Sequence, residues 1–249
     1  STYQRGIPYL WAFDGAFFIS PGYIDNQLFD GAIQRWAGKP AMWWPLVTVP
    51  FSQPEKADKR FFQQRDVDVV YVGNPYGQKI EKLIRLKRHF GDRMCIHGRW
   101  QFKGYLGFVR GLLGKPVYPH RVISLTPEER TRLYWKTKIG FNMHFSEHPC
   151  ETGNLRMYET PAHGMMMMCD KAAANAHARI FEPGAEAVYY DSVDEAIDLI
   201  EYYLIHEEER IRIAQGGFER YWRDYEWEKN LMMLLDWCMA LTPQQKLRD

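Results

Sequence analysis

Two glutamates, Glu151 and Glu159, lie on either side of a short polar turn that contains Gly153 and Asn154. An apolar run precedes this segment, and four consecutive methionines from Met165 follow it. The pattern predicts a strand, a turn, a helix and a second strand. α/β proteins hold phosphate groups with this unit, because the N–H groups at the start of the helix point at the anion.

These residue types suit a nucleotide sugar, which offers a ribose diol, a pyrophosphate and a hydroxylated sugar. A carboxylate accepts two hydrogen bonds from a cis diol, and we predict this contact for Glu159. Glu151 is predicted to reach the sugar hydroxyls. The predicted phosphate ligands are consecutive groups at the helix start: Gly153, Asn154, Leu155 and Arg156. The alternative is that both glutamates are ordinary acids at a helix start, favoured there by the helix dipole.

One nearby motif suggests a different chemistry. The stretch from His144 to His148 matches the inverted zinc motif His-x-x-Glu-His. That motif needs a helix to place both histidines on one face. Here a strand is predicted before His144 and Pro149 ends any helix, so we expect no metal. His144 is then either a sugar contact at a strand end or an ordinary polar residue at a strand edge.

Composition limits the possible function. The chain has 249 residues, 46% of them hydrophobic, which is enough for one large or two small domains. Lys and Arg number 32 and Asp and Glu number 31, giving a formal net charge of +1. With no excess or cluster of positive charge, nucleic acid is not a predicted partner.

The four cysteines are far apart and form no Cys-x-x-Cys pair. We therefore expect free thiols and a cytoplasmic location, with peripheral membrane association left open. No apolar run approaches the roughly 18 residues of a membrane helix, so we expect no transmembrane segment. The chain starts with Ser1 rather than methionine, which is consistent with a fragment of a longer protein.

Short buried strands alternate with helices along most of the chain, which predicts βαβ units and a parallel sheet. Thr126 is expected to cap one helix, with Glu129 completing a capping box. Strands are expected at residues 14–20, 68–72, 93–98, 139–145 and 165–169, and helices at 25–38, 78–89, 126–137, 193–206, 207–221 and 227–239.

Three blocks in the second half of the chain resemble a known family. They are Asn154-Leu-Arg-Met-Tyr-Glu-Thr-Pro-Ala-His-Gly164, Arg179-Ile-Phe-Glu-Pro-Gly-Ala-Glu186 and Tyr202-Tyr-Leu-Ile-His-Glu-Glu-Glu-Arg210. In this order they resemble the CgeB-like group of glycosyltransferases. The resemblance implies a Rossmann-like parallel sheet flanked by helices, forming the C-terminal, donor-binding half of a GT-B fold with a truncated N-terminal portion.

The resemblance also implies roles for single residues. In the Glu-x7-Glu pair of many retaining GT-B transferases, the second glutamate binds the ribose and the first contacts the donor sugar, as Glu159 and Glu151 would here. Gly73 and Asn74 are implied to lie against the donor. Arg99 is implied to pair with a phosphate, with a simple salt bridge as the alternative. The chain departs from the family in the turn, where the glycine comes one position early.

The same resemblance suggests four parts. Residues 1–50 are interpreted as a remnant of an acceptor-side domain, and 51–65 as a linker. Residues 66–225 form the predicted nucleotide-sugar-binding domain, and 226–249 a helix that packs back toward the N-terminal segment. A complete GT-B enzyme needs a larger N-terminal domain. The chain is therefore a fragment, has its partner domain on another polypeptide, or has a reduced first domain.

The sequence thus predicts a glycosyltransferase domain that binds a nucleotide-diphosphate sugar and transfers the sugar to a glycan or other acceptor. Retention of configuration and independence of metals and cofactors are expected. Two alternatives stay open. One is a GT-B-fold sugar-nucleotide epimerase or hydrolase, and the other is a non-catalytic interaction domain that keeps the fold.

Overall fold

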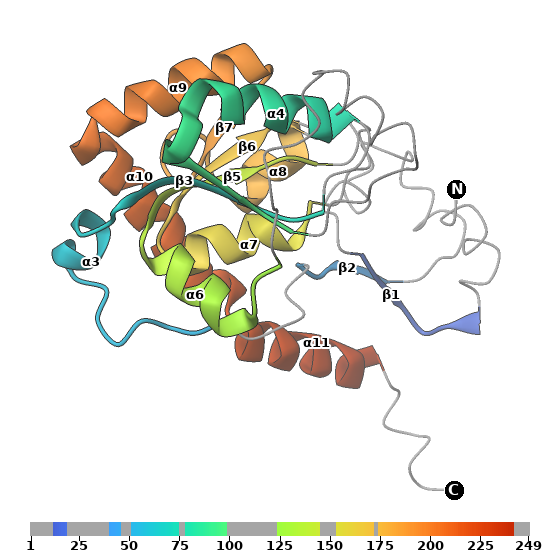
Figure 1. Ribbon diagram of the computed structural model, residues 1–249. Helices are drawn as coiled ribbons and strands as arrows, with labels where there is room; N and C mark the ends of the chain where they lie inside the picture. Colours follow the sequence, from blue (N-terminus) through green and yellow to red (C-terminus); the bar gives the residue numbers. More distant parts are fainter. Residues whose placement is uncertain are drawn as a thin grey trace, which may run out of the picture.

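The computed structural model describes residues 12–18, 40–45, 51–74, 78–98, 124–144, 153–171 and 174–241 (Figure 1). Its centre is a five-stranded parallel sheet with the order β4-β3-β5-β6-β7. These strands are β3 (Val67–Val72), β4 (Met94–His97), β5 (Thr137–Asn142), β6 (Met166–Asp170) and β7 (Val188–Tyr190). A separate parallel pair consists of β1 (Ala16–Phe18) and β2 (Ala41–Trp43). The predicted α/β class is confirmed.

Helices cover both faces of the sheet. The described α-helices are α3 (Lys59–Gln63), α4 (Gln78–Phe90), α6 (Pro127–Trp135), α7 (Leu155–Ala162), α8 (Ala174–Ile180), α9 (Val193–Ile205), α10 (Glu207–Arg220) and α11 (Trp227–Leu241). In Figure 1, α4 and α9 lie together on one side of the strands, and α6 and α7 lie on the other. α10 contacts both α9 and α7.

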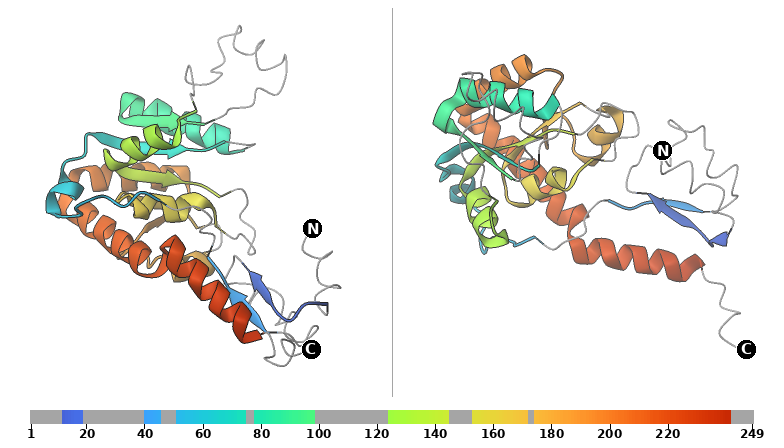
Figure 2. Two further views of the ribbon diagram at one scale, coloured as in Figure 1. Left: turned by 90° about the horizontal axis from the view of Figure 1, so that it is seen from below. Right: turned by 45° about the vertical axis from the view of Figure 1, so that its right-hand side comes forward.

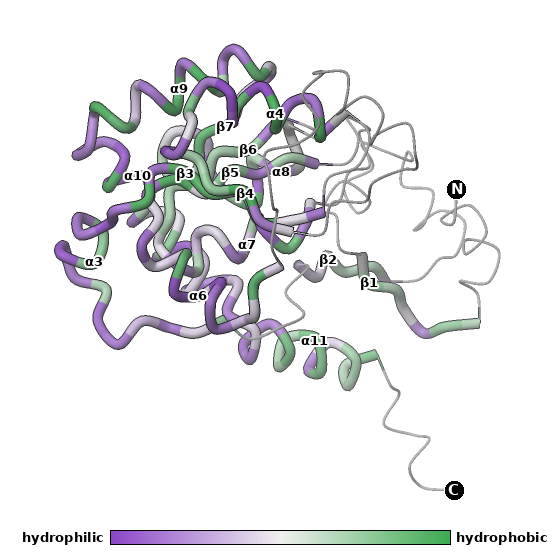
Figure 3. The backbone as a smooth tube through the Cα atoms, in the orientation of Figure 1, coloured by the Kyte–Doolittle hydropathy of each residue, from purple (hydrophilic) through white to green (hydrophobic). Residues whose placement is uncertain are grey.

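The methionine-rich strand β6 shows how the core is built. Met166 and Met168 pack in one hydrophobic cluster, whereas Met167 and Cys169 pack in the second cluster on the opposite face. A strand that is covered on both faces needs no polar alternation. The prediction of a buried strand here is confirmed, and Figure 3 shows the hydrophobic strands enclosed by more hydrophilic helices.

Local signals set the helix boundaries near the predicted positions. Thr126 caps α6, and its capping box with Glu129 forms as expected. β7 and α8 are additional elements that the sequence pattern does not indicate. β7 has only three residues, and α8 has seven with little apolar periodicity.

A short helix lies within the segment that was predicted to be a linker, and it packs against the main core. Residues 59–63 form α3, whose Phe62 is buried in the main core. The buried Arg65 guanidinium donates to the carbonyl oxygens of Tyr134, Thr137 and His163, at 3.1, 2.6 and 2.9 Å. Burial and the nearby Arg210 lower the pKa of Arg65 to about 9. This arginine therefore joins α3 to the amino end of β5 and to the segment before β6.

The C-terminal helix contacts the N-terminal strand pair. The Trp44 indole N–H donates to the Asn230 carbonyl at 2.9 Å, and a Cβ atom at Gly15 would lie 2.6 Å from Leu241. Both views in Figure 2 show α11 running alongside β1 and β2. The boundaries of the four predicted parts stay predictions. Within the described ranges, no helix has the length and apolar character needed to span a membrane.

Several sequence predictions fall outside the described residues. These are the helix at 25–38, Glu151, Arg99, and the His148 end of the zinc-like motif. The structure therefore gives no account of them.

Acid sensitivity follows from His163, the residue after α7. Its Nδ1 lies 2.7 Å from the Glu159 carbonyl oxygen, and burial lowers its pKa from 6.5 to about 4. Between these values the unfolded chain holds a proton that the folded chain lacks, so stability falls as the pH drops from 6.5 to 4. Each pH unit in this range costs at most about 1.4 kcal/mol.

Between pH 6.5 and pH 5 the parent chain loses unfolding free energy because of His163, and we expect His163→Asn to reduce this loss by about 1.6 kcal/mol. Urea denaturation at both pH values measures this difference. His206→Gln, which changes an exposed histidine, is the control and should keep the parent's pH dependence. An unchanged slope in His163→Asn would contradict the assignment.

Candidate functional site

The strand order changes direction between β3 and β5, and the space at the carboxyl ends of these two strands is named the crevice. The chain passes from β3 through α4 to β4 on one side, and then through α6 to β5 on the other side. Open parallel sheets bind ligands at such a switch point, just beyond the carboxyl ends of the strands. Gly73 follows β3 at this edge, and Met143 and His144 follow β5.

The guanidinium group of Arg156, from α7, lies in this crevice. Its Nη1 donates to the Val72 carbonyl at 2.7 Å, its Nε to Asn142 Oδ1 at 3.0 Å, and its Nη2 to the Met143 carbonyl at 3.3 Å. The group also lies over the Tyr71 ring, 4.7 Å from its centroid. All these acceptors are neutral. No carboxylate in the described part of the chain forms an ion pair with Arg156.

A second cation reaches the same place. Lys79 Nζ, near the start of α4, donates to the Met143 carbonyl at 3.1 Å. This carbonyl oxygen therefore accepts hydrogen bonds from two positively charged side chains, Lys79 and Arg156, and the crevice carries a local positive charge. Lys79 is not among the site residues predicted from the sequence. In the sequence, Lys79 comes shortly after the glycine turn that follows β3, and this position is the pattern that could have indicated a role at the site.

Gly73 makes room for the arginine. A Cβ atom at this position would overlap Nη1 of Arg156 and approach the Tyr71 hydroxyl. Any larger residue would therefore push the guanidinium out of the crevice. The next residue, Asn74, is exposed at the same edge of the sheet.

The structure explains the shifted glycine in the turn before α7. Gly153 has a φ of +81°, in the left-handed region that glycine adopts readily, and its buried position leaves little room for a side chain. Asn154 is then the N-cap. Its Oδ1 accepts from the Arg156 backbone N–H at 3.0 Å, and its Nδ2 donates to Asn142 Oδ1 at 2.9 Å. The helix starts at Leu155, and the contacts of Asn154 with Asn142 and the Met143 carbonyl place this start at the end of β5.

Glu159 lies deeper along α7, with its side chain buried against α6. Arg130 Nε is 2.9 Å from Oε1, and the Tyr134 hydroxyl donates to Oε2 at 3.2 Å. Burial raises the pKa of Glu159, although the Arg130 charge and the Tyr134 hydrogen bond oppose this effect. The carboxylate already has partners within the chain. The predicted contact with ribose stays a prediction, and the diol would have to share or replace these partners.

His144 lies at the same strand edge and is held by Asp170 at the end of β6. Its Nδ1 is 2.6 Å from Asp170 Oδ1, and its backbone N–H donates to Oδ2 at 2.9 Å. Burial raises the pKa of Asp170, but the hydrogen bonds from His144 outweigh burial, so the pKa lies below its ordinary value. Asp170 thus stays ionised at neutral pH.

Two further side chains surround His144, and sequence reasoning assigned neither to the site. The rings of His144 and His177 are 4.3 Å apart, and Cys169 Sγ is 3.8 Å from His144 Nδ1. Burial raises the pKa of Cys169 well above its ordinary value, so the thiol is protonated at neutral pH unless a cation stabilises the thiolate.

A polar pocket of about 170 Å³ adjoins Asp170 at the carboxyl ends of β6 and β7. Its walls carry charges of both signs, from two lysines and two aspartates. The lining residues are Lys82, Asp170, Lys171, Tyr190, Asp191, Ser192 and Val193. The edge of the sheet therefore offers a cationic crevice at β3 and β5 and a polar hollow beside it.

The structure thus brings most of the predicted residues to one edge of the sheet. These are Gly73, Asn74, His144, Gly153, Asn154, Leu155 and Arg156. Glu159 is turned toward α6 instead.

The sequence and the fold can be compared with known proteins. The family model described as "Glycosyl transferase-like" matches residues 78–236, well over half of the chain. No curated protein matches the chain in sequence.

Solved structures share the fold at low sequence identity. Anabaena Alr3699/HepE in complex with UDP and glucose matches 94% of this chain and 65% of its own, with 12% identity and a TM-score of 0.63. Sucrose-phosphate synthase from Thermosynechococcus elongatus matches 96% of this chain and 61% of its own, with 12% identity and a TM-score of 0.64.

A third structure is a mutant of S. aureus TarM in complex with Fondaparinux, alpha-GlcNAc-glycerol and UDP. It matches 95% of this chain and 46% of its own, with 12% identity and a TM-score of 0.66. The chain therefore spans between about half and two thirds of the length of these structures. The shared architecture is that of GT-B glycosyltransferases, as the sequence predicted.

The cap of α7 can be tested on its own. Replacing Asn154 with alanine removes the N-cap and the hydrogen bond to Asn142 together, and we expect a loss of about 2 kcal/mol of unfolding free energy. Ser192→Ala, which removes the N-cap of α9, is the control and should cost about 1 kcal/mol. Denaturant unfolding compares the two variants. Equal losses would show that the bond to Asn142 adds nothing.

Proposed function

Because the chain belongs to the glycosyl transferase-like family, we propose that it binds a nucleotide-diphosphate sugar in the crevice between β3 and β5. It then serves transfer of the sugar to a glycan or other acceptor. Membership of the CgeB-like group within this family is part of the proposal.

The observation that carries the proposal is the position of Arg156. Its planar guanidinium is fixed at the switch point by neutral oxygens of Val72, Asn142 and Met143. Its charge is therefore available to an anion, and a forked guanidinium matches the oxygens of a phosphate. The start of α7 and Lys79 add positive potential at the same edge.

This arrangement suits the chemistry of glycosyl transfer. The bond between the sugar C1 and the diphosphate oxygen breaks, and negative charge develops on the departing diphosphate. Arg156, Lys79 and the helix N-terminus stabilise that charge with groups already in place, which is an efficient form of catalysis. In this proposal no metal is needed on the diphosphate, and the sugar keeps its configuration, as the resemblance implies. Glu159 binds the ribose and Glu151 the sugar.

UDP is the first nucleotide to test, because it is present in the similar HepE and TarM structures. The acceptor site is proposed to depend on parts that the described residues do not supply. An epimerase or hydrolase would consume the donor without any acceptor. If the chain were a non-catalytic interaction domain, UDP would not raise its unfolding free energy. If UDP binds, a concentration of about 100 times its Kd raises the unfolding free energy by about 2.7 kcal/mol.

We expect Arg156→Ala to weaken UDP binding roughly 10- to 150-fold, because a charge-assisted hydrogen bond contributes about 1.5–3 kcal/mol. Isothermal calorimetry measures the affinity, and circular dichroism confirms that the variant is folded. Arg223→Ala is the control, since that arginine is exposed and paired with Asp224. Unchanged UDP affinity in Arg156→Ala would contradict the proposed binding site.

The proposed ribose contact has a sharper test. Glu159→Gln should weaken UDP binding roughly 10-fold through loss of a charge-assisted hydrogen bond. Binding of 2′,3′-dideoxy-UDP should be no weaker in this variant than in the parent, because that ligand lacks the diol. Glu128→Gln, on the exposed side of α6, is the control. A similar loss for both nucleotides would mean that Glu159 acts only through the fold.

A further inference from the structure

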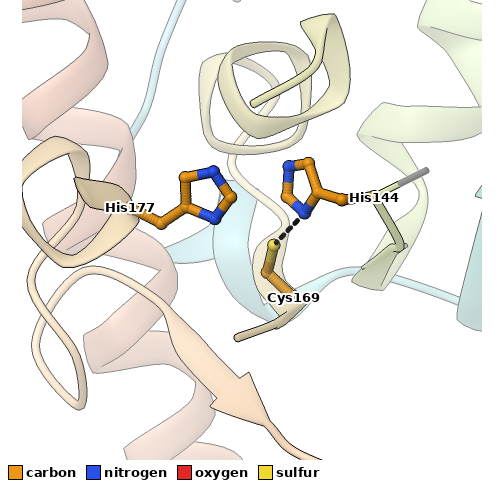
Figure 4. A group of neighbouring side chains, drawn as sticks. All are labelled: His144, Cys169 and His177. Atoms are coloured by element: carbon orange, nitrogen blue, oxygen red, sulfur yellow. Dashed lines mark hydrogen bonds between the residues drawn. The ribbon is translucent and has the colours of Figure 1, made fainter. Parts of the chain in front are cut away.

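Three metal-ligating side chains converge at the carboxyl edge of the sheet. His144 follows β5, Cys169 belongs to β6 and His177 belongs to α8. One ligand atom from each lies within 4.8 Å of the other two, and all three residues are buried. Figure 4 shows both imidazole rings turned toward each other, with the Cys169 sulfur beside them.

His144 is oriented in the manner of a metal ligand. The Asp170 carboxylate, 2.6 Å from Nδ1, holds the ring proton on that nitrogen. The lone pair is therefore on Nε2, which is buried and has no hydrogen-bond partner among the described residues. Histidines that bind metals almost always donate their other ring N–H to a carboxylate, a carbonyl or water in this way.

We propose that His144, Cys169 and His177 bind a single zinc-type ion. Two imidazoles and a thiolate are the donors that zinc prefers, and they discriminate against magnesium, which takes oxygen ligands. In a tetrahedral zinc site, ligand atoms are about 3.4–3.6 Å apart, so the side chains would close in by about 1 Å on binding. Cys169 releases its thiol proton to solvent, and both histidines bind as neutral rings.

The proposed ion site is distinct from the proposed diphosphate site. It would join the end of β5, strand β6 and helix α8, whereas Arg156 donates to groups at the ends of β3 and β5. Because its ligands are nitrogen and sulfur, it does not replace the magnesium that bridges phosphates in other enzymes. The proposal therefore agrees with transfer that needs no metal on the diphosphate, and it does not depend on that function.

The zinc-like sequence motif and the proposed ion site share His144 but differ in the other ligands. The motif links His144 to Glu147 and His148, which are close along the chain. The fold links His144 instead to residues of two later elements, β6 and α8. A spacing pattern for a helical motif does not detect ligands that a parallel sheet assembles.

Cobalt(II) is the probe for this site, because a cobalt–thiolate bond gives a near-ultraviolet charge-transfer band. The full chain, freed of any affinity tag and dialysed against a chelator, should bind one equivalent of cobalt with this band. Zinc should displace cobalt, and a large excess of magnesium should not. Asp170→Asn should weaken cobalt binding roughly 10- to 100-fold, because it removes the carboxylate that orients His144.

Cys169→Ser should abolish the charge-transfer band. Cys238→Ser, which removes an exposed thiol on α11, should leave it unchanged. If Cys169→Ser does not fold, His177→Gln provides the same test by elemental analysis for bound zinc, which should fall from one equivalent to none. Absence of the band in the parent chain, or its persistence in Cys169→Ser, overturns the proposal.

Discussion

The hydrogen bonds of the Arg156 guanidinium at the ends of β3 and β5 hold the site together. Parallel strands that separate at a switch point leave carbonyl oxygens without strand partners, and buried carbonyls need donors. Arg156 donates to two of them, at Val72 and Met143. Gly73 must stay small to admit it, and α7 must start where Asn154 places it.

A second arginine, Arg65, makes the same kind of hydrogen bonds but is buried inside the fold. At the opposite edge of the sheet, Arg65 also donates to backbone carbonyls, those of Tyr134, Thr137 and His163. It is 5% exposed, so no ligand can reach it, and its lowered pKa reflects the cost of burying its charge. Arg156 lies at the edge where open parallel sheets receive ligands. The location of each guanidinium in the sheet, rather than its contacts, separates the structural Arg65 from Arg156, for which a binding role is proposed.

Much of the fold could be predicted from the sequence, because its signals are local. The apolar runs predicted β3, β5 and β6, and the capping box at Thr126 predicted the start of α6. The turn before α7 was predicted from Gly153 and its neighbours for the same reason. The partners of Glu159 and the approach of Lys79 to Met143 could not be predicted, since each contact joins segments far apart in the chain. The short elements β7 and α8 carry no periodicity that would reveal them.

Asn142 connects the two proposed sites. Its Oδ1 accepts from Arg156 Nε and Asn154 Nδ2, while its Nδ2 donates to Cys169 Sγ at 3.5 Å. One amide thus has its oxygen on the phosphate side and its nitrogen on the thiol side, and its orientation is common to both. Thermodynamic linkage then requires reciprocity. Any change that an ion at Cys169 makes in the affinity for a diphosphate equals the change that the diphosphate makes in the affinity for the ion.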